Sequence, residues 1–271
     1  MNPIVLAVVS VTGIGLICAV ILAAASKLMA VQEDKRALQL RAVLPGANCG
    51  ACGYAGCDGY AKALADGENS RTNLCIPGGD GVSRQLSDLL GVAFQDVVEQ
   101  VAVVRCRGDC GHSRQRMTYR GTQTCAAAHL TFAGPSACAN GCIGLGDCAR
   151  VCPQDAICIQ NGIAHVDPRR CVGCGLCAKT CPSKVIDLIA DVDRALVVCN
   201  NHSGGAVSVK NCDVGCVGCR LCEKACPEHA VSVVNRLAVI DYAKCTGCGQ
   251  CAAACRRGCI VIGDFRGALS I

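Results

Sequence analysis

The cysteines between Cys216 and Cys255 are spaced as ligands of iron–sulfur clusters. From Cys216 to Cys226 they follow the pattern C-x2-C-x2-C-x3-C-P, and the same spacing without the proline runs from Cys245 to Cys255. Three thiolates at two-residue gaps can hold one cubane cluster, while the fourth ligates the neighbouring cubane. The pattern therefore predicts two [4Fe-4S] clusters. Site 4 takes Cys216, Cys219, Cys222 and Cys255, and site 5 takes Cys226, Cys245, Cys248 and Cys251.

Two other kinds of cysteine chemistry fit this spacing less well. Zinc sites usually combine separated C-x2-C pairs rather than a run of three followed by a fourth. Disulfide scaffolds are typical of small secreted domains and show no preference for a proline after a fourth cysteine. The spacing therefore favours iron–sulfur clusters held in a reducing compartment.

The composition agrees with thiolates that are loaded with metal. The chain has 271 residues, of which 28 are cysteine, and it has no tryptophan and few other aromatic residues. So small an apolar core needs another source of stability, and metal–thiolate bonds supply one. The formal net charge is +5 with neutral cysteines. Five cubanes with their thiolates, at about −2 each, bring it to about −5, so we predict no nucleic-acid partner.

A separate group of four cysteines precedes this pattern. Cys49, Cys52 and Cys57 are spaced C-x2-C-x4-C, and Cys75 follows in the sequence Asn-Leu-Cys-Ile-Pro-Gly-Gly. The glycines among them let the backbone close around a cofactor and offer amide donors to its sulfides. We predict a [4Fe-4S] cluster here, site 1, with these four cysteines as ligands. A four-cysteine zinc site is the alternative.

The cysteine pattern also repeats at an offset of 74 residues. The proline after the fourth cysteine repeats with it, so the agreement implies duplication of one unit. A second ferredoxin-like module should therefore precede the first one described. The matching cysteines are Cys125 and Cys199, Cys138 and Cys212, Cys142 and Cys216, Cys148 and Cys222, Cys152 and Cys226, and the run Cys171, Cys174, Cys177 and Cys181 with Cys245, Cys248, Cys251 and Cys255.

One ligand position is lost in the earlier module, where Leu145 replaces the equivalent of Cys219. Cys138 is the nearest substitute, so we predict that it completes site 2. Loss of this cluster is the alternative. The predicted ligands are Cys138, Cys142, Cys148 and Cys181 for site 2, and Cys152, Cys171, Cys174 and Cys177 for site 3.

Several cysteines remain without a site. We predict at least five [4Fe-4S] clusters, and four of the remaining thiolates could hold a sixth cluster between the two modules. Cys106 and Cys199 each follow a short apolar run, which suggests that they are structural equivalents. Cys158 and Cys259 stand among apolar residues and are predicted to be buried. The candidates for a sixth cluster are Cys106, Cys110, Cys125, Cys199 and Cys212.

Short strands and helices must position these ligands. In each module an apolar strand, a turn and a return strand follow the proline, which predicts hairpins over 156–166 and 230–240. A β-branched run predicts a strand over 97–105 that delivers Cys106. Residues 58–67 and 83–90 are expected to form short helices.

Five arginines follow the strand over 97–105. They could form a docking face for an acidic electron carrier, neutralise cluster charge locally, or simply form a solvated surface. These residues are Arg105, Arg107, Arg114, Arg116 and Arg120.

The N-terminal stretch is apolar, with no charged side chain from Ile4 to Ala25. About twenty such residues in a helix span a bilayer. A cleaved signal peptide is the alternative, although residues 1–3 include no basic side chain. Lysines and arginines follow the run, so the positive-inside rule places the remainder on the cytoplasmic side of the inner membrane. The sequence therefore predicts a single transmembrane helix in contact with the lipid bilayer.

Together these features resemble the B subunit of the Rnf electron-transport complex in its long polyferredoxin form. The resemblance rests on the segments 48–53, 75–79 and 141–148 and covers essentially the whole chain. It implies a membrane-bound complex that oxidises reduced ferredoxin and passes electrons towards NAD+ while exporting Na+ or H+. The implied partners are soluble ferredoxin, as donor, and other integral-membrane and flavin subunits. Related complexes pass electrons to a redox-sensing transcription factor instead, and this acceptor is an alternative.

The residues alone support a narrower role. No G-x-G-x-x-G stands in a strand–helix context, so no nicotinamide site is evident. A single uncharged span cannot carry ions by itself, so NAD+ reduction and ion transport are expected on partner subunits. The chain then acts as the electron-transfer subunit of the oxidoreductase. A membrane-tethered carrier of clusters or metal is the competing class of function.

The predicted fold is α+β, with a single N-terminal transmembrane helix, a small four-Cys Fe–S domain and two tandem bacterial-type 2[4Fe-4S] ferredoxin-like modules. The predicted boundaries are an anchor (1–26), a connector (27–44), the Fe–S domain (45–95), a linking segment (96–135), module I (136–190), a second linking segment (191–213) and module II (214–271).

Overall fold

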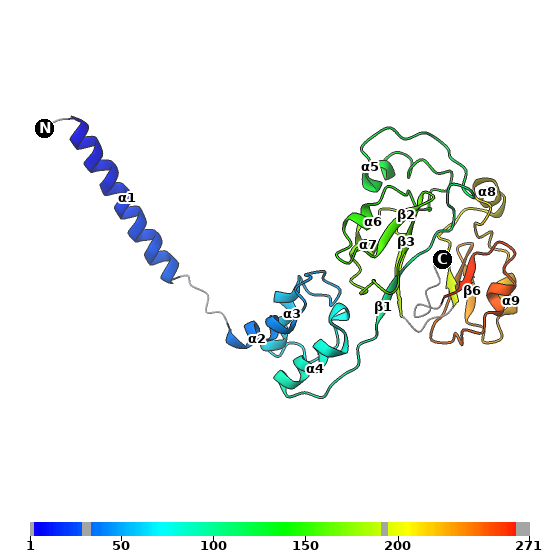
Figure 1. Cartoon of the computed structure of the whole chain (residues 1–271), viewed down its shortest axis with the longest axis horizontal. Coiled ribbons are helices and arrows are strands. Elements are labelled where there is room, and N and C mark those ends of the chain that lie inside the picture. Colours follow the sequence, from blue (N-terminus) through cyan, green and yellow to red (C-terminus); the bar gives the residue numbers. More distant parts are fainter. Residues whose placement is uncertain (1–2, 29–33, 191–194, 264–271) are drawn as a thin grey trace.

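The computed structural model describes residues 3–28, 34–190 and 195–263. Helix α1 (Pro3–Leu28) lies apart from the rest of the chain, which continues through the Fe–S domain to modules I and II (Figure 1). Residues 1–2 of the predicted anchor, 29–33 of the connector, 191–194 of the second linking segment and 264–271 of module II lie outside the described residues.

Helix α1 forms where the sequence predicts a transmembrane helix, but the predicted role is wrong. A span needs about twenty consecutive apolar residues to cross the hydrocarbon core. Over the described residues, no helix combines the length and the hydropathy that this requires. The fold class is therefore corrected to an α+β chain in which α1 precedes the Fe–S domain and the two modules.

The Fe–S domain is built from helices α2 (Lys35–Val43), α3 (Cys57–Ala65) and α4 (Gly79–Leu90) and the 3-10 turn η1 (Ile76–Gly78). The predicted helices over 58–67 and 83–90 are confirmed, although α4 begins earlier. Helix α2 lies in the predicted connector, yet its Leu40 is buried with Tyr60, Leu64 and Leu86. The connector helix is therefore part of this domain's core.

Each module contains one of the predicted hairpins. Strands β2 (Ile157–Gln160) and β3 (Ile163–Val166) pair in module I, and β6 (Val231–Val234) and β7 (Leu237–Ile240) pair in module II. The two-residue turn Asn161-Gly162 has φ of 49° and 77°, as a type I′ turn requires. Both hairpin predictions are confirmed, because local turn chemistry decides them.

A second two-stranded sheet in each module uses a strand from the preceding linking segment. Strand β1 (Gln100–Val104) pairs with β4 (Ile186–Ala190), and β5 (Ala195–Val197) pairs with β8 (Ile260–Ile262). The linking segments are therefore structural parts of the modules. The remaining helices are α5 (Cys125–His129), α6 (Asp147–Arg150), α7 (Leu176–Thr180), α8 (Gly205–Asn211), α9 (Leu221–Ala225) and α10 (Gln250–Ala253).

Strand β1 joins the two modules through the alternation of its side chains. Ala102 packs into the core of module I, whereas Val101 and Val103 pack against Leu196 and Val198. Successive strand residues point to opposite faces, so β1 serves both cores. Full burial of an aliphatic side chain stabilises by about 1.5–3 kcal/mol, so this contact fixes how the modules meet.

Candidate iron–sulfur sites

All 28 cysteines lie in the described part of the chain, and none of them forms a disulfide. Among the described residues, no three His, Cys, Asp or Glu side chains come close enough together to hold a single metal ion. Sixteen of the thiols instead gather in groups of four around four small cavities.

Site 1 brings together all four of its predicted ligands. Cys49, Cys52, Cys57 and Cys75 line one cavity beneath helix α3. The Asn48 side chain accepts a hydrogen bond from the Cys57 amide at 2.8 Å, which fixes the start of this helix. A β-carbon on Gly78 would lie 2.7 Å from the Val82 side chain and 3.1 Å from Cys75 Sγ. Glycine at this position therefore lets the backbone pack closely between Val82 and the Cys75 sulfur.

Burial raises the pKa of the Cys75 thiol to about 11. Such a thiol stays protonated at neutral pH unless a cation compensates the thiolate charge. Iron supplies that positive charge when it binds, so the buried thiols of site 1 fit a metal cluster better than an empty core.

Site 3 also gathers its predicted ligands. Cys152, Cys171, Cys174 and Cys177 line one cavity in module I. Cys171 Sγ accepts a hydrogen bond from the Ala102 amide at 3.4 Å, and Cys152 Sγ accepts one from the Ala156 amide at 3.4 Å. Such amide donors to ligand sulfurs are typical of iron–sulfur sites.

Site 2 has a different fourth cysteine from the one predicted. Cys142, Cys148 and Cys181 line a cavity with Cys125, and Cys138 is not part of this lining. Cys125 begins helix α5 in the linking segment, so a residue distant in sequence stands in for the ligand lost at Leu145. The structure therefore brings Cys125, rather than Cys138, together with Cys142, Cys148 and Cys181. We propose these four as the ligands of site 2.

Asp147 holds Cys125 at this site. Its side chain is buried and accepts hydrogen bonds from the amides of Cys125 and Ala126, both at 2.9 Å. It also forms an ion pair with Arg150. A carboxylate at the first amides of a helix both caps it and complements its dipole. Asp147 is a positioning residue that sequence reasoning missed, because its partners lie in another segment.

Sites 4 and 5 bring cysteines together as the predicted cross-ligation requires. Burial, followed by the nearby Cys216, Cys255 and Cys219, raises the pKa of Cys222 to about 11. These four residues are the predicted ligands of site 4. Within site 5, burial and then the nearby Cys226 and Cys245 raise the pKa of Cys251. Cys248, the fourth predicted ligand there, is exposed, so site 5 lies close to the surface.

Cys259 is a buried thiol beside site 4. Its hydrogen bonds lower the pKa of Cys255 to about 5 and that of Cys216 to about 6. Its Sγ also lies 3.1 Å from the Val214 carbonyl oxygen, which competes with these sulfurs for the single thiol hydrogen. The prediction that Cys259 is buried is confirmed. The same prediction for Cys158 is wrong, because the alternation of strand β2 turns this side chain to solvent.

The other unassigned cysteines separate into two groups. Cys106, Cys199 and Cys212 line a cavity between the modules, and Cys138 is the fourth cysteine there. Cys110 is exposed and outside this lining. The offset of 74 residues had paired Cys125 with Cys199, but the two occupy different sites.

The arginines after β1 make local contacts. Arg105 pairs with Asp187 at 2.6 Å, and Arg114 pairs with Asp213 at 3.3 Å. Arg107 donates to the Gly258 carbonyl at 3.0 Å, and Arg116 donates to the carbonyls of Phe132 and Gly134. Four of the five arginines therefore have partners within the chain.

Sites 1 and 3 lie next to each other. Lys179 of module I donates to the Cys49 carbonyl at 2.8 Å and so ties site 1 to site 3. Burial, and after it the nearby thiols of Cys49, Cys171 and Cys152, raise the pKa of Cys174. A residue of site 1 therefore lies within electrostatic reach of a residue of site 3, although the two belong to different domains.

These sites define a class of protein, the polyferredoxin-like iron–sulfur proteins. Residues 44–77 match the family described as "Putative Fe-S cluster", and residues 137–185 and 215–259 match the "4Fe-4S dicluster domain". The two matches to the dicluster domain fall on the hairpins and ligands of modules I and II.

Similar proteins narrow this class to one family. The chain is 42% identical to the B subunit of the proton-translocating ferredoxin:NAD(+) oxidoreductase complex of Clostridium ljungdahlii, over 96% of this chain and 93% of that protein. It is 37% identical to the Na(+)-translocating counterpart of Acetobacterium woodii, over 91% and 74%. It is 34% identical to the B subunit of the ion-translocating oxidoreductase complex of Methanosarcina acetivorans, over 90% and 92%. The chain belongs to this family, the B subunits of Rnf complexes, as the sequence motifs predict.

Proposed function

We propose that this chain is the multi-cluster electron-transfer subunit of an ion-translocating ferredoxin:NAD+ oxidoreductase complex. In this role it accepts electrons from reduced ferredoxin and passes them towards NAD+, while partner subunits reduce NAD+ and export Na+ or H+. The names of its relatives describe ion translocation, so we place the protein in a membrane-associated complex with other Rnf subunits. Its thiols belong on the reducing side of that membrane.

The contact between site 1 and site 3 is the observation that carries this proposal. A carrier of clusters has no need of two adjoining sites, whereas a relay depends on them. Each bound [4Fe-4S] cluster supplies one-electron redox chemistry. The chain's own contribution is to bury the ligands, exclude water and hold successive sites at fixed separations. Lys179 and strand β1 do this across the domain boundaries.

Freeze-quench EPR on the whole complex tests the proposed direction of flow. Reduced ferredoxin is mixed anaerobically with oxidised complex, and NADH is measured in parallel. We expect the clusters of this subunit to become reduced before NADH appears and to be reoxidised when NAD+ is in excess. Full-rate NADH formation while these clusters stay oxidised would exclude the relay.

A second experiment separates the relay from a cluster carrier. The purified protein is incubated with an apo-ferredoxin that lacks its own cluster, and iron is followed in both proteins. A relay should keep its iron over many reduction cycles, because its ligands are protein cysteines on all sides. Net transfer of iron to the apo-protein would support the carrier instead.

A further inference from the structure

A cavity between the two modules is lined by four cysteines that belong to none of sites 1 to 5 as revised above. Cys106 and Cys138 come from the module I side, and Cys199 and Cys212 come from the module II side. Cys199 and Cys212 are buried, at 7% and 8% exposed. We propose that these four thiols form a sixth [4Fe-4S] site, called here the bridging site, which links the two modules.

The two cysteines from each side occupy equivalent positions. Cys106 Sγ accepts a hydrogen bond from the Cys142 amide at 3.4 Å, and Cys199 Sγ accepts one from the Cys216 amide at 3.3 Å. Cys142 and Cys216 are themselves equivalent ligands in the repeat. The sequence prediction that Cys106 and Cys199 are equivalent is therefore confirmed by their contacts.

The backbone just before these cysteines is equivalent as well. The Arg105 amide donates to the Val185 carbonyl at 2.6 Å, and the Val198 amide donates to the Cys259 carbonyl at 2.8 Å. Val185 and Cys259 are separated by the offset of the repeat. Duplication of the unit thus generates two matching pairs of thiols, which face one cavity when the modules pack together.

The second pair of cysteines is equivalent in the same way. The Gly141 amide donates to the Cys138 carbonyl at 3.3 Å, and the Gly215 amide donates to the Cys212 carbonyl at 3.5 Å. Both glycines line the cavity. A β-carbon on Gly141 would lie 3.6 Å from Cys138 Sγ, in van der Waals contact with the thiol.

Gly108 shapes the opposite wall of the cavity. A β-carbon built on it would lie 3.1 Å from Cys212 Sγ and 3.9 Å from Cys106 Sγ. This glycine therefore faces one ligand from each module and leaves unfilled the space beside their sulfurs. A cluster that bridges the modules needs that space.

The loop segment 112–114 holds the two halves of the site together. The Arg114 amide donates to the Asn211 carbonyl at 2.9 Å, and the Asn211 side chain donates to the Ala137 carbonyl at 3.1 Å. The Asp213 amide donates to the His112 carbonyl at 2.8 Å. The residues that flank Cys138 and Cys212 are thus bound to the same segment, which fixes the ligands from both modules before a cluster binds.

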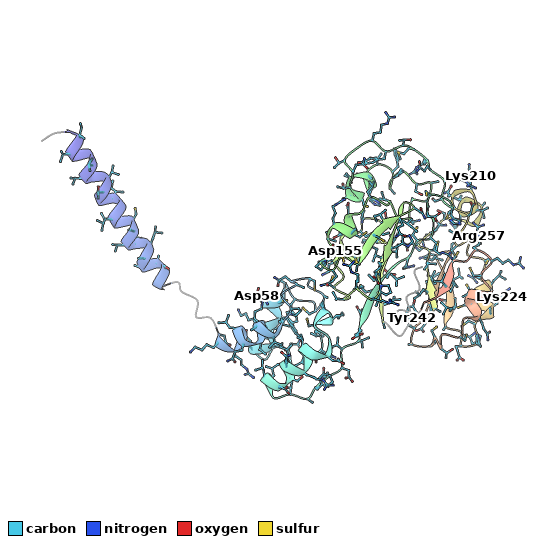
Figure 2. The ribbon with its side chains drawn as sticks, viewed as in Figure 1. Asp58, Asp155, Lys210, Lys224, Tyr242 and Arg257 are labelled. Carbon is cyan, nitrogen blue, oxygen red and sulfur yellow. The ribbon has the colours of Figure 1, made fainter. Side chains whose placement is uncertain are left out.

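The local charge also suits a cluster. Arg107 lines the cavity, and the guanidinium of Arg257, labelled in Figure 2, donates to the Cys212 carbonyl at 2.6 Å. A cubane with four thiolates carries about −2 in its oxidised state. Cations at this boundary offset that charge and support loading of the site.

In the proposed relay, the bridging site connects site 2 of module I to site 4 of module II. This role rests on the proposed function. Its Cys106 accepts a hydrogen bond from the backbone of the site 2 ligand Cys142, and its Cys199 accepts one from the site 4 ligand Cys216. The order of sites along the molecule is then site 1, site 3, site 2, bridging site, site 4 and site 5.

Iron analysis with matched variants tests the bridging site. The full chain is purified anaerobically, and iron, acid-labile sulfide and zinc are measured per chain. We expect about twenty-four irons and no zinc in the wild type, because each cubane holds four irons. Cys138→Ala and Cys212→Ala should each lose about four irons or show the EPR signal of a three-iron cluster. The control Cys110→Ala changes a thiol outside the cavity and should keep all of them.

A variant that keeps all four cysteines separates loss of the cluster from misfolding of the chain. Gly108→Ala keeps all four thiols but crowds the sulfur of Cys212, and it should lose the same cluster selectively. Gly81→Ala, where the structure leaves open space, is its control. About twenty irons in the wild type, unchanged in Cys138→Ala, would overturn the bridging site and leave the relay proposal intact. Zinc in this cavity would overturn it as well, whereas a wild type without iron would overturn both.

Discussion

Asp147 provides the sharpest test of how site 2 is completed. Its buried carboxylate accepts the amides of Cys125 and Ala126, both at 2.9 Å, and pairs with Arg150. Asp147→Ala leaves both amides without this acceptor. The Cys125 amide is buried, and leaving it unpaired costs about 1–3 kcal/mol. Ala126 is exposed, so the loss at its amide is counted as a lost helix cap, about 0.5–2 kcal/mol. We therefore expect the variant to destabilise the Cys125 segment by about 2–4 kcal/mol.

Such a change should be visible as accelerated loss of one cluster. A tenfold change in an equilibrium corresponds to 1.4 kcal/mol, so local opening of the segment should increase about 30- to 1,000-fold. The assay follows bleaching of visible absorbance by an iron chelator under anaerobic conditions, together with iron per chain. Asp147→Ala should bleach in a fast phase that accounts for one cluster. Asp147→Asn keeps one acceptor oxygen and should be intermediate.

The control for charge is Asp88→Ala, which removes an exposed carboxylate in helix α4. It should bleach as the wild type does. If Asp147→Ala bleached no faster than Asp88→Ala and kept all its iron, Cys125 would not depend on Asp147, and the revised ligand set of site 2 would lose its support.

Three further predictions concern the docking of the Fe–S domain, the thiol beside site 4 and the metal itself. Lys179→Met removes the hydrogen bond to the Cys49 carbonyl and should weaken magnetic coupling between the clusters of sites 1 and 3 at unchanged iron content. Its control, Lys224→Met, changes an exposed residue of module II (Figure 2) and should leave the coupling unchanged. Cys259→Ala should keep its iron but lower the reduction potential of one cluster, since hydrogen bonds near ligand sulfurs stabilise the more negative reduced form; an unchanged potential would place Cys259 in a packing role only. Chelation of iron should abolish the β-structure seen by circular dichroism, because cysteines make up much of each module's core; an unaltered spectrum would show that packing alone maintains the modules.

The local parts of this architecture could be predicted from the sequence. The spacing of Cys152 to Cys177 brings four thiols around one cavity, because short gaps in the chain restrict where each sulfur can lie. The hairpin at Asn161-Gly162 follows from residues that tolerate positive φ. Helix α1 likewise forms over the apolar N-terminal stretch, but its predicted role as a membrane span does not hold over the described residues.

Only the tertiary structure decided which thiols lie together at the remaining cavities. Cys138 was the nearer candidate for site 2 in sequence, yet Asp147 draws the amide of Cys125 to that cavity and leaves Cys138 for the space between the modules. The equivalence of Cys106 and Cys199 follows from pairing of β1 with β4 and of β5 with β8. Spacing determines ligands that are neighbours in the chain, whereas strand pairing and packing bring together those that are distant, because no local constraint links such residues before the modules fold.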